Sequence, residues 1–77
     1  MTNKAIADIT AERERQHTIG YDNAHDDEHG VLHLLEWASR YARRAAEGIG
    51  TPAGRADLVK CAALVVAAIE ATDRNTP

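Results

Sequence analysis

The sequence has a single cysteine and no apolar run long enough to cross a membrane. Cys61 is the only cysteine among 77 residues, so no disulfide can form within the chain, and its apolar surroundings are typical of a buried thiol. The longest apolar run, CAALVVAAI at 61–69, is far shorter than the ~20 residues that a spanning helix needs. The N-terminal stretch turns polar within a few residues, unlike a secretory signal peptide. We therefore expect a soluble intracellular protein, located in the cytoplasm.

The chain also lacks the positive charge of a generic nucleic-acid binder. Nine Lys and Arg residues stand against twelve Asp and Glu, which gives a net charge of −3, so neither nucleic acid nor membrane is an expected partner. Ser39 has no neighbouring base pattern, and GIGTPAG lacks the lysine of a P-loop. Acidic residues gather at 22–28 and arginines at 40–55. This asymmetry suits a ligand or partner subunit that interacts with both the acidic and the basic group. The alternative is that both groups are solvated helix ends.

No stretch alternates between apolar and polar residues as a strand would, whereas three stretches have helical periodicity. The sequence predicts one all-α domain over 1–77, with helices at about 3–17, 27–47 and 52–73 and a loop at 21–25. The expected caps are Thr2 or Asn3, Asp26 or Asp27, and Thr51, with Pro52 at the first position of the third helix. Glycines at 20, 48 and 50 are expected to end the first two helices.

The apolar patterns predict an oligomer. The second helix has one apolar face, formed by Val31, Leu34, Leu35, Ala38, Tyr41, Ala42 and Ala45. The third has a main stripe of Leu58, Cys61, Ala62, Val65, Ile69 and Thr72, and it is apolar on nearly every other side as well. A helix that is apolar all round is expected to be buried all round. We therefore expect the second and third helices to form an antiparallel hairpin that pairs with a second chain in a four-helix bundle.

A polar stripe runs along the opposite face of the second helix. Its members are Asp26, His29, His33, Glu36, Arg40 and Arg43 or Arg44. One aspartate at the helix start is explained by capping, but the histidines are not. The spacing of His29, His33 and Glu36 suits metal ligands on a helix, and Asp26 completes the candidate set. The alternative is that these are ordinary surface residues.

The basic residues suggest a phosphate site near the turn between the second and third helices. Guanidinium groups bind phosphates through paired hydrogen bonds, and an aromatic ring can stack on a base. The candidate ligand-binding residues are Arg40, Arg43, Arg44, Arg55, Lys60, Trp37, Tyr41, His29 and His33. The alternative is that the aromatics belong to the core and that the arginines pair with Glu36, Glu47 and Asp57.

Three motifs resemble a family of small proteins encoded by phages and prophages. They are ERERQ at 12–16, HDDEHG at 25–30 and RADLVKCAALVVAAIEATDR at 55–74. Together they cover about half of the chain, in the order in which that family has them. The closing helix is also similar to that of the MazG-like all-α nucleotide pyrophosphohydrolases.

The MazG-like resemblance implies an oligomeric helical scaffold and a phosphate-binding cleft. Those enzymes hold Mg²⁺ with ExxE and ExxD carboxylate pairs on two helices and split nucleoside triphosphates to monophosphate and pyrophosphate. In this sequence Ser39 stands three positions after Glu36, and Lys60 stands three positions after Asp57, where the second carboxylate of each pair is expected. Neither carboxylate pair is therefore complete. A hard dication needs several oxygen ligands. The cluster at 25–29 could serve as the metal site instead, and the protein would then still be an enzyme.

We therefore expect non-enzymatic binding and sequestration of a nucleotide-like phosphorylated small molecule at a subunit interface, without a cofactor. Phage-encoded helical oligomers of this size commonly bind something that belongs to the host, which would suit a role against host defence signalling. There are two alternative hypotheses. In the first, the chain is a divergent Mg²⁺-dependent pyrophosphohydrolase; in the second, it is a protein-binding oligomer without a small ligand.

Overall fold

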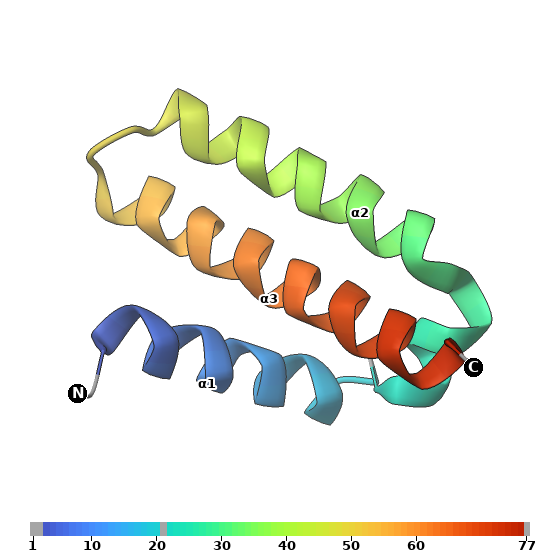
Figure 1. The fold of residues 1–77 in the computed structure, drawn as a ribbon. Coiled ribbons are helices and arrows are strands. Elements are labelled where there is room, and N and C mark those ends of the chain that lie inside the picture. The colour runs from blue at the N-terminus through green and yellow to red at the C-terminus, as the bar shows by residue number, and fades with distance from the viewer. Residues whose placement is uncertain (1–2, 21, 77) are drawn as a thin grey trace.

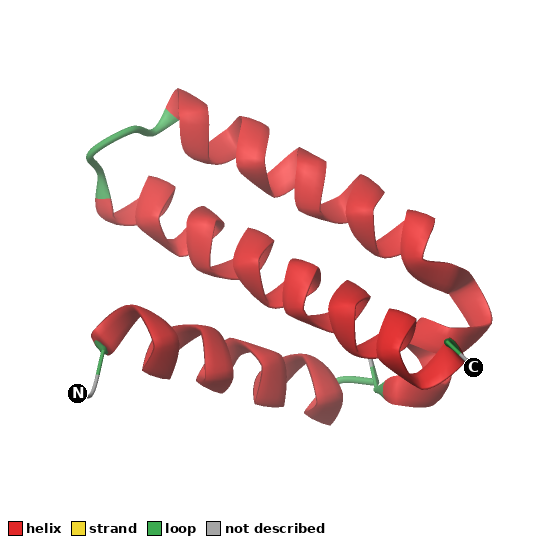
Figure 2. Cartoon of the chain, in the orientation of Figure 1, coloured by secondary structure: helices red, strands yellow, loops and turns green. Residues whose placement is uncertain are grey.

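The computed structural model describes residues 3–20 and 22–76, which form three helices and no strand (Figures 1 and 2). The helices are α1 (Lys4–Thr18), α2 (Asn23–Glu47) and α3 (Pro52–Asn75). α3 lies in the middle, with α2 antiparallel along one side of it and α1 along the other. The predicted all-α class is thus confirmed. Over the described ranges, no helix is long and apolar enough to cross a membrane.

Local capping residues set most of the helix ends. The Asn3 side chain accepts a hydrogen bond from the Ala5 amide at 2.8 Å, and Thr51 Oγ1 accepts one from the Gly54 amide at 3.0 Å. Pro52 is the first residue of α3, where its missing N–H costs nothing. The predicted caps Asn3 and Thr51 are therefore confirmed, as is the end of α2 just before Gly48.

The predicted start of α2 is wrong. The helix begins at Asn23, and its cap is Asp22, whose Oδ1 accepts a hydrogen bond from the His25 amide at 3.0 Å. Of the predicted loop at 21–25, residue 21 lies outside the described residues, Asp22 is the cap and 23–25 are helical. Asp26 is not a cap because its carboxylate is fully buried in an ion pair with Arg13 of α1.

A break at Gly30 divides the predicted polar stripe of α2. Gly30 has φ 84° and ψ 166°, a conformation that residues with a side chain rarely adopt. The short first segment carries Asp26 into the interior, whereas Glu36 and Arg40 on the long segment are exposed. The continuous stripe from Asp26 to the arginines is therefore absent.

The core of the described residues is small and is made mostly of alanine. One cluster comprises Leu34, Ala67, Ala68 and Ala71, with Val31 and Leu64 partly buried against it, and Ala38, Ala45 and Ala63 are buried as well. Alanine side chains let helix axes come close together. The face of α3 predicted as its main stripe instead lies largely on the outside of the chain, where Leu58 is 58% exposed and Ile69 is 55% exposed. Leu35 and Ala42 of the predicted α2 face are exposed too.

The turn between α2 and α3 depends on two glycines in contact. A methyl group placed on Gly54 would collide with the backbone carbonyl of Gly48. Replacing a helical glycine with alanine normally stabilises a helix by about 1 kcal/mol. We expect Gly54→Ala to lower the free energy of unfolding by about 1 to 3 kcal/mol instead, because backbone atoms must shift. Urea unfolding followed by circular dichroism measures this, and a gain in stability would contradict the close contact.

Candidate functional site

The three helices enclose a cavity of about 250 Å³. All three contribute to its wall, which is lined by Glu12, Arg15, Gln16, Ile19, His25, His33, Leu34, Trp37, Tyr41, Lys60 and Leu64. We call it the three-helix cavity. Four of these residues are ligand candidates from the sequence, namely His33, Trp37, Tyr41 and Lys60. The structure therefore brings about half of the predicted binding residues to one place.

Aromatic rings and cations lie together at this cavity. The ring centroids of Trp37 and Tyr41 are 6.4 Å apart. The guanidinium of Arg40 lies 4.7 Å from the Trp37 ring centroid, and the ammonium of Lys60 lies 5.7 Å from that of Tyr41. Arg44 also lies 5.5 Å from the Tyr41 ring centroid. These separations are within the range of cation–π attraction, which holds the charges beside the rings.

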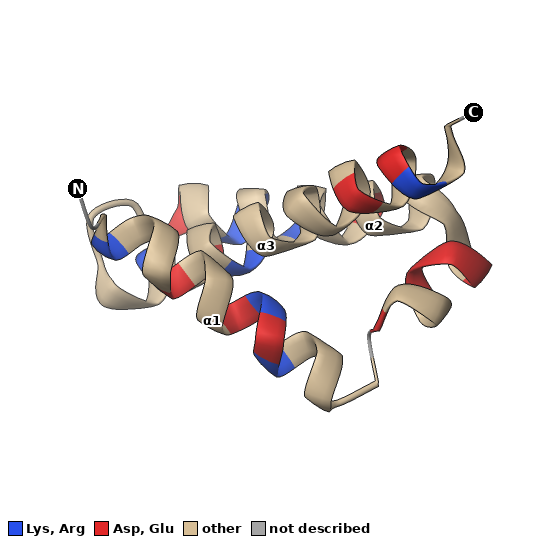
Figure 3. Cartoon of the chain, turned by 60° about the horizontal axis from the view of Figure 1, so that its bottom comes forward, with Lys and Arg blue, Asp and Glu red and all other residues tan. Residues whose placement is uncertain are grey.

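Acidic and basic residues alternate along α1 (Figure 3), and Glu12 and Arg15 among them line the cavity. Arg15 donates two hydrogen bonds to the Glu12 carboxylate, at 2.7 and 2.9 Å, and Gln16 donates a third at 3.3 Å. The hydrogen bond from Arg15 is the main cause that lowers the pKa of Glu12, so this carboxyl stays ionised and offsets the charge of Arg15. Lys60, by contrast, forms no ion pair within 3–20 and 22–76.

Three histidines of α2 form a ladder that reaches the cavity. The His25 and His29 ring centroids are 4.3 Å apart, and those of His29 and His33 are 4.9 Å apart. His25 and His33 line the cavity, whereas His29 lies between them without lining it. Imidazoles present hydrogen-bond donors to an anion and become cations when protonated. The ladder therefore adds to the groups that favour an anionic ligand.

A buried ion pair joins the three helices beside the cavity. Arg13 Nη2 of α1 lies 2.7 Å from Asp26 Oδ2 of α2, and Arg13 Nε lies 3.2 Å from Glu70 Oε1 of α3. Asp26 is fully buried, and only 9% of the Arg13 side chain is exposed. Gln16, one turn along α1, accepts a further hydrogen bond from Arg13 at 3.5 Å. This network fixes α1 and thereby one wall of the cavity.

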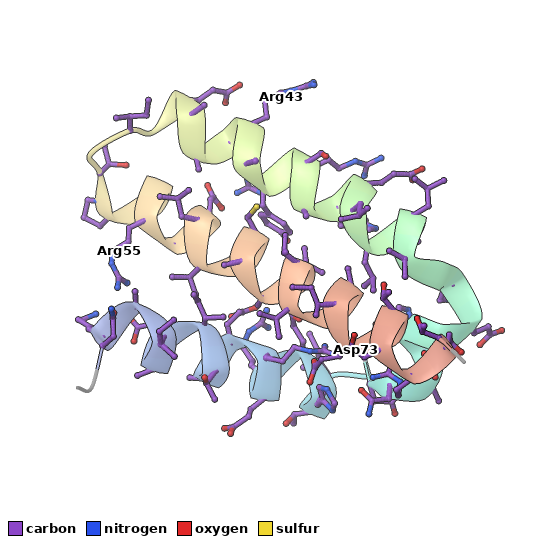
Figure 4. All side chains as sticks on the ribbon, in the orientation of Figure 1. Arg43, Arg55 and Asp73 are labelled. Atoms are coloured by element: carbon purple, nitrogen blue, oxygen red, sulfur yellow. The ribbon has the colours of Figure 1, made fainter. Side chains whose placement is uncertain are left out.

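Other predicted binding residues do not line the cavity, although Arg44 lies beside Tyr41, which does. Arg43 is exposed and points away from α3 (Figure 4). Arg55 points toward α1, where its guanidinium lies 2.8 Å from the carboxylate of Asp8 (Figure 4). Arg44 lies 3.7 Å from the largely buried carboxylate of Asp57, which is one of the acidic partners that the sequence suggested.

The candidate metal ligands are not assembled into a site. Asp26 is engaged by Arg13, while Glu36 is exposed on the other side of the Gly30 break. His29 and His33 stack on each other. Within the described part of the chain, no three His, Cys, Asp or Glu side chains are placed so that they could hold a metal ion together. The metal hypothesis thus gains no support from the geometry.

Sequence reasoning missed the α1 wall of the cavity. Glu12, Arg15, Gln16 and Ile19 recur at steps of one to four residues, which places them along one side of a helix. This spacing is the signal that the sequence offered. It does not reveal which side of α1 meets the other helices, because that depends on the long-range pairs of Arg13 with Asp26 of α2 and Glu70 of α3.

Comparisons with known proteins give no match: no family model fits the chain, and neither curated proteins nor solved structures resemble it detectably. The likeness to phage proteins and to MazG-like enzymes therefore stays a prediction.

Proposed function

We propose that the protein binds and sequesters a nucleotide-like phosphorylated small molecule in the three-helix cavity, without converting it. The observation that supports this is the meeting of Lys60 and His33 with the Trp37–Tyr41 pair in one cavity. Ligand pockets usually measure roughly 300 to 1,000 Å³. At about 250 Å³, this cavity lies just below that range, so its occupant is no larger than a mononucleotide.

The proposed binding mode assigns one task to each kind of group. A base stacks on the exposed side of Trp37 or Tyr41, since an aromatic ring accepts any base on its face. The phosphate takes hydrogen bonds from Lys60, with His33 as a second donor. Glu12 repels the ligand little, because Arg15 holds its carboxylate through two hydrogen bonds.

We also propose that the protein works as an oligomer, most simply a dimer formed by α2 and α3. The large apolar side chains that these helices leave exposed support this. Native mass spectrometry of the purified protein tests both proposals in one measurement. We expect twice the chain mass together with a releasable mass of a few hundred daltons.

The cavity proposal predicts that Lys60→Gln weakens binding of AMP by roughly 10- to 150-fold, as expected from about 1.5 to 3 kcal/mol for a charged hydrogen bond. Binding of adenosine, which has no phosphate, should be unchanged. The matched control is Arg43→Gln, which removes one charge from the exposed side of α2. Isothermal titration calorimetry of the unmodified protein and of both variants, with AMP and with adenosine, measures these affinities. An equal loss of affinity for AMP in both variants would show that the effect comes from the overall charge of the protein and not from Lys60 in the cavity.

Two other outcomes would overturn the proposal. Release of pyrophosphate from nucleoside triphosphates that needs Mg²⁺ and stops in Glu36→Ala would make the protein an enzyme. A bare chain that binds neither AMP nor other mononucleotides, yet forms a stable complex with a purified host protein, would make it a protein-binding oligomer.

A further inference from the structure

The exposed apolar residues of α3 follow a regular spacing. Leu58, Ala62, Val65, Ile69 and Thr72 are separated by steps of four, three, four and three residues. This is the spacing with which helices pack along each other in coiled coils and bundles. We call these five residues the outer stripe of α3. Leu58, Val65 and Ile69 are 58%, 38% and 55% exposed. Leu35 of α2, beside Val65 and Ile69, is 42% exposed.

The chain exposes more surface than a folded monomer of its size should. Its accessible surface is 5283 Å², whereas a compact monomer of 8.4 kDa is expected to expose about 4,600 Å². The excess is several hundred Å². A standard stable interface buries about 800 Å² on each partner. The excess therefore matches in scale what one copy would bury against another.

The charges beside the outer stripe fit a second copy of the same chain. Arg55 and Asp73 are 18 residues apart, which is about five helical turns, so both lie on the same side of α3. Arg55 flanks one end of the outer stripe and Asp73 the other (Figure 4). In an antiparallel pair related by a two-fold axis, each end meets the opposite end of the partner. Arg55, whose guanidinium pairs with Asp8 of its own chain at 2.8 Å, then also lies near the carboxylate of Asp73 in the other chain. Asp73 has no ion pair of its own in the part of the chain described.

We infer that two chains associate through the outer stripe of α3, antiparallel, with the two-fold axis close to Val65. Val65 is the middle member of the stripe, and the midpoint between 55 and 73 falls one residue away from it. Ala62, one turn from Val65 on the outer stripe, then lets the two backbones approach closely. This inference rests on the proposed oligomer and specifies its face and register.

The arrangement also decides where the ligands lie. Lys60 and Leu64 of the three-helix cavity are on the side of α3 away from the outer stripe, since helical side chains follow one another at 100°. Trp37 and Tyr41 are likewise on the other side of α2 from Leu35. Each chain of the dimer therefore keeps its own cavity, facing outward. The binding stoichiometry is one ligand per chain, and each site lies within one chain rather than at a subunit interface, where the sequence placed it.

Disulfide cross-linking tests the face and the register. Val65→Cys in a Cys61→Ala background places a thiol at the axis, opposite its own copy. Val66→Cys in the same background is the matched control, because Val66 is 36% exposed but lies one residue further around the helix. With mild oxidant we expect Val65→Cys to form the linked dimer at least about 10-fold faster. Faster linking through Val66→Cys, or equal rates, would overturn the assigned register.

Light scattering on the unmodified chain separates this inference from the proposed oligomer. A monomer at all concentrations would reject both. A dimer in which Val65→Cys does not link preferentially would reject the outer stripe alone. As a second test we expect Asp73→Lys to raise the dissociation constant several-fold, whereas Glu14→Lys, the same charge change on the exposed side of α1, leaves it unchanged. Equal effects of both changes would also count against the assigned pairing.

Discussion

Replacing Asp26 with asparagine lowers the free energy of unfolding by about 3 kcal/mol or more. The substitution keeps the shape of the side chain but leaves the guanidinium of Arg13 buried without its main anion. Breaking a buried ion pair on one side costs about 3 to 5 kcal/mol, because the remaining charge cannot reach water. Glu70, which is half exposed, still pairs with Arg13 and offsets part of this loss of stability. For a small domain with a total stability of about 5 to 15 kcal/mol the loss is severe, and urea unfolding measures it.

The neighbouring residue supplies a matched control for this prediction. Asp27 also pairs with an arginine, at 2.8 Å from Arg74, but this pair lies at the surface. The hydrogen bond from Arg74 lowers the pKa of Asp27 below its ordinary value, so its small contribution is present above that ordinary value and is lost as the pH falls below it. We expect Asp27→Asn to leave the urea midpoint nearly unchanged at pH 7. Equal effects of the two substitutions would show that burial of the Arg13–Asp26 pair is unimportant.

Val65→Asp is expected to turn the dimer into a monomer that remains helical. At the two-fold axis the new carboxylate would face its own copy, and such a juxtaposition of like charges costs several kcal/mol. The dissociation constant should therefore rise by more than about 100-fold. In the isolated chain Val65 is 38% exposed, so the carboxylate stays hydrated and α3 persists. Analytical ultracentrifugation with circular dichroism distinguishes the two effects.

Val66→Asp is the control for this experiment. Val66 has almost the same exposure as Val65, at 36%, and differs mainly in direction. We expect Val66→Asp to remain dimeric. If Val65→Asp unfolds the chain in addition to separating the dimer, no side of α3 accepts a charged residue, as the sequence alone suggested. The outer stripe would then be a core without which the chain does not fold.

The helix ends predictable from the sequence are those that depend on neighbouring residues. Asn3, Thr51 and Pro52 act within a single turn, so their roles follow from local chemistry. The start of α2 could not be predicted in this way. Asp22 and Asp26 are equally good caps by type, and the choice between them is made by Arg13, which lies 13 residues before Asp26 and on another helix.

The apolar pattern of α3 was ambiguous for a different reason. Periodicity identifies apolar faces but does not say which of two faces turns inward within one chain. In the structure the alanine face packs against α1 and α2, because small side chains allow the closest approach, and the larger Leu58 and Ile69 remain outside. The cavity was only half predictable, since its α1 wall depends on the same tertiary packing.

The position of α1 beside the α2–α3 pair has a consequence for the kinetics of exchange with solvent. α1 packs mainly on α3, and the Arg13 network ties its middle to α2. Amide hydrogens of α1 should therefore exchange through a local opening of low free energy, while those of α3 exchange only on global unfolding. Because α1 forms one wall of the cavity, an occupant would slow exchange there first.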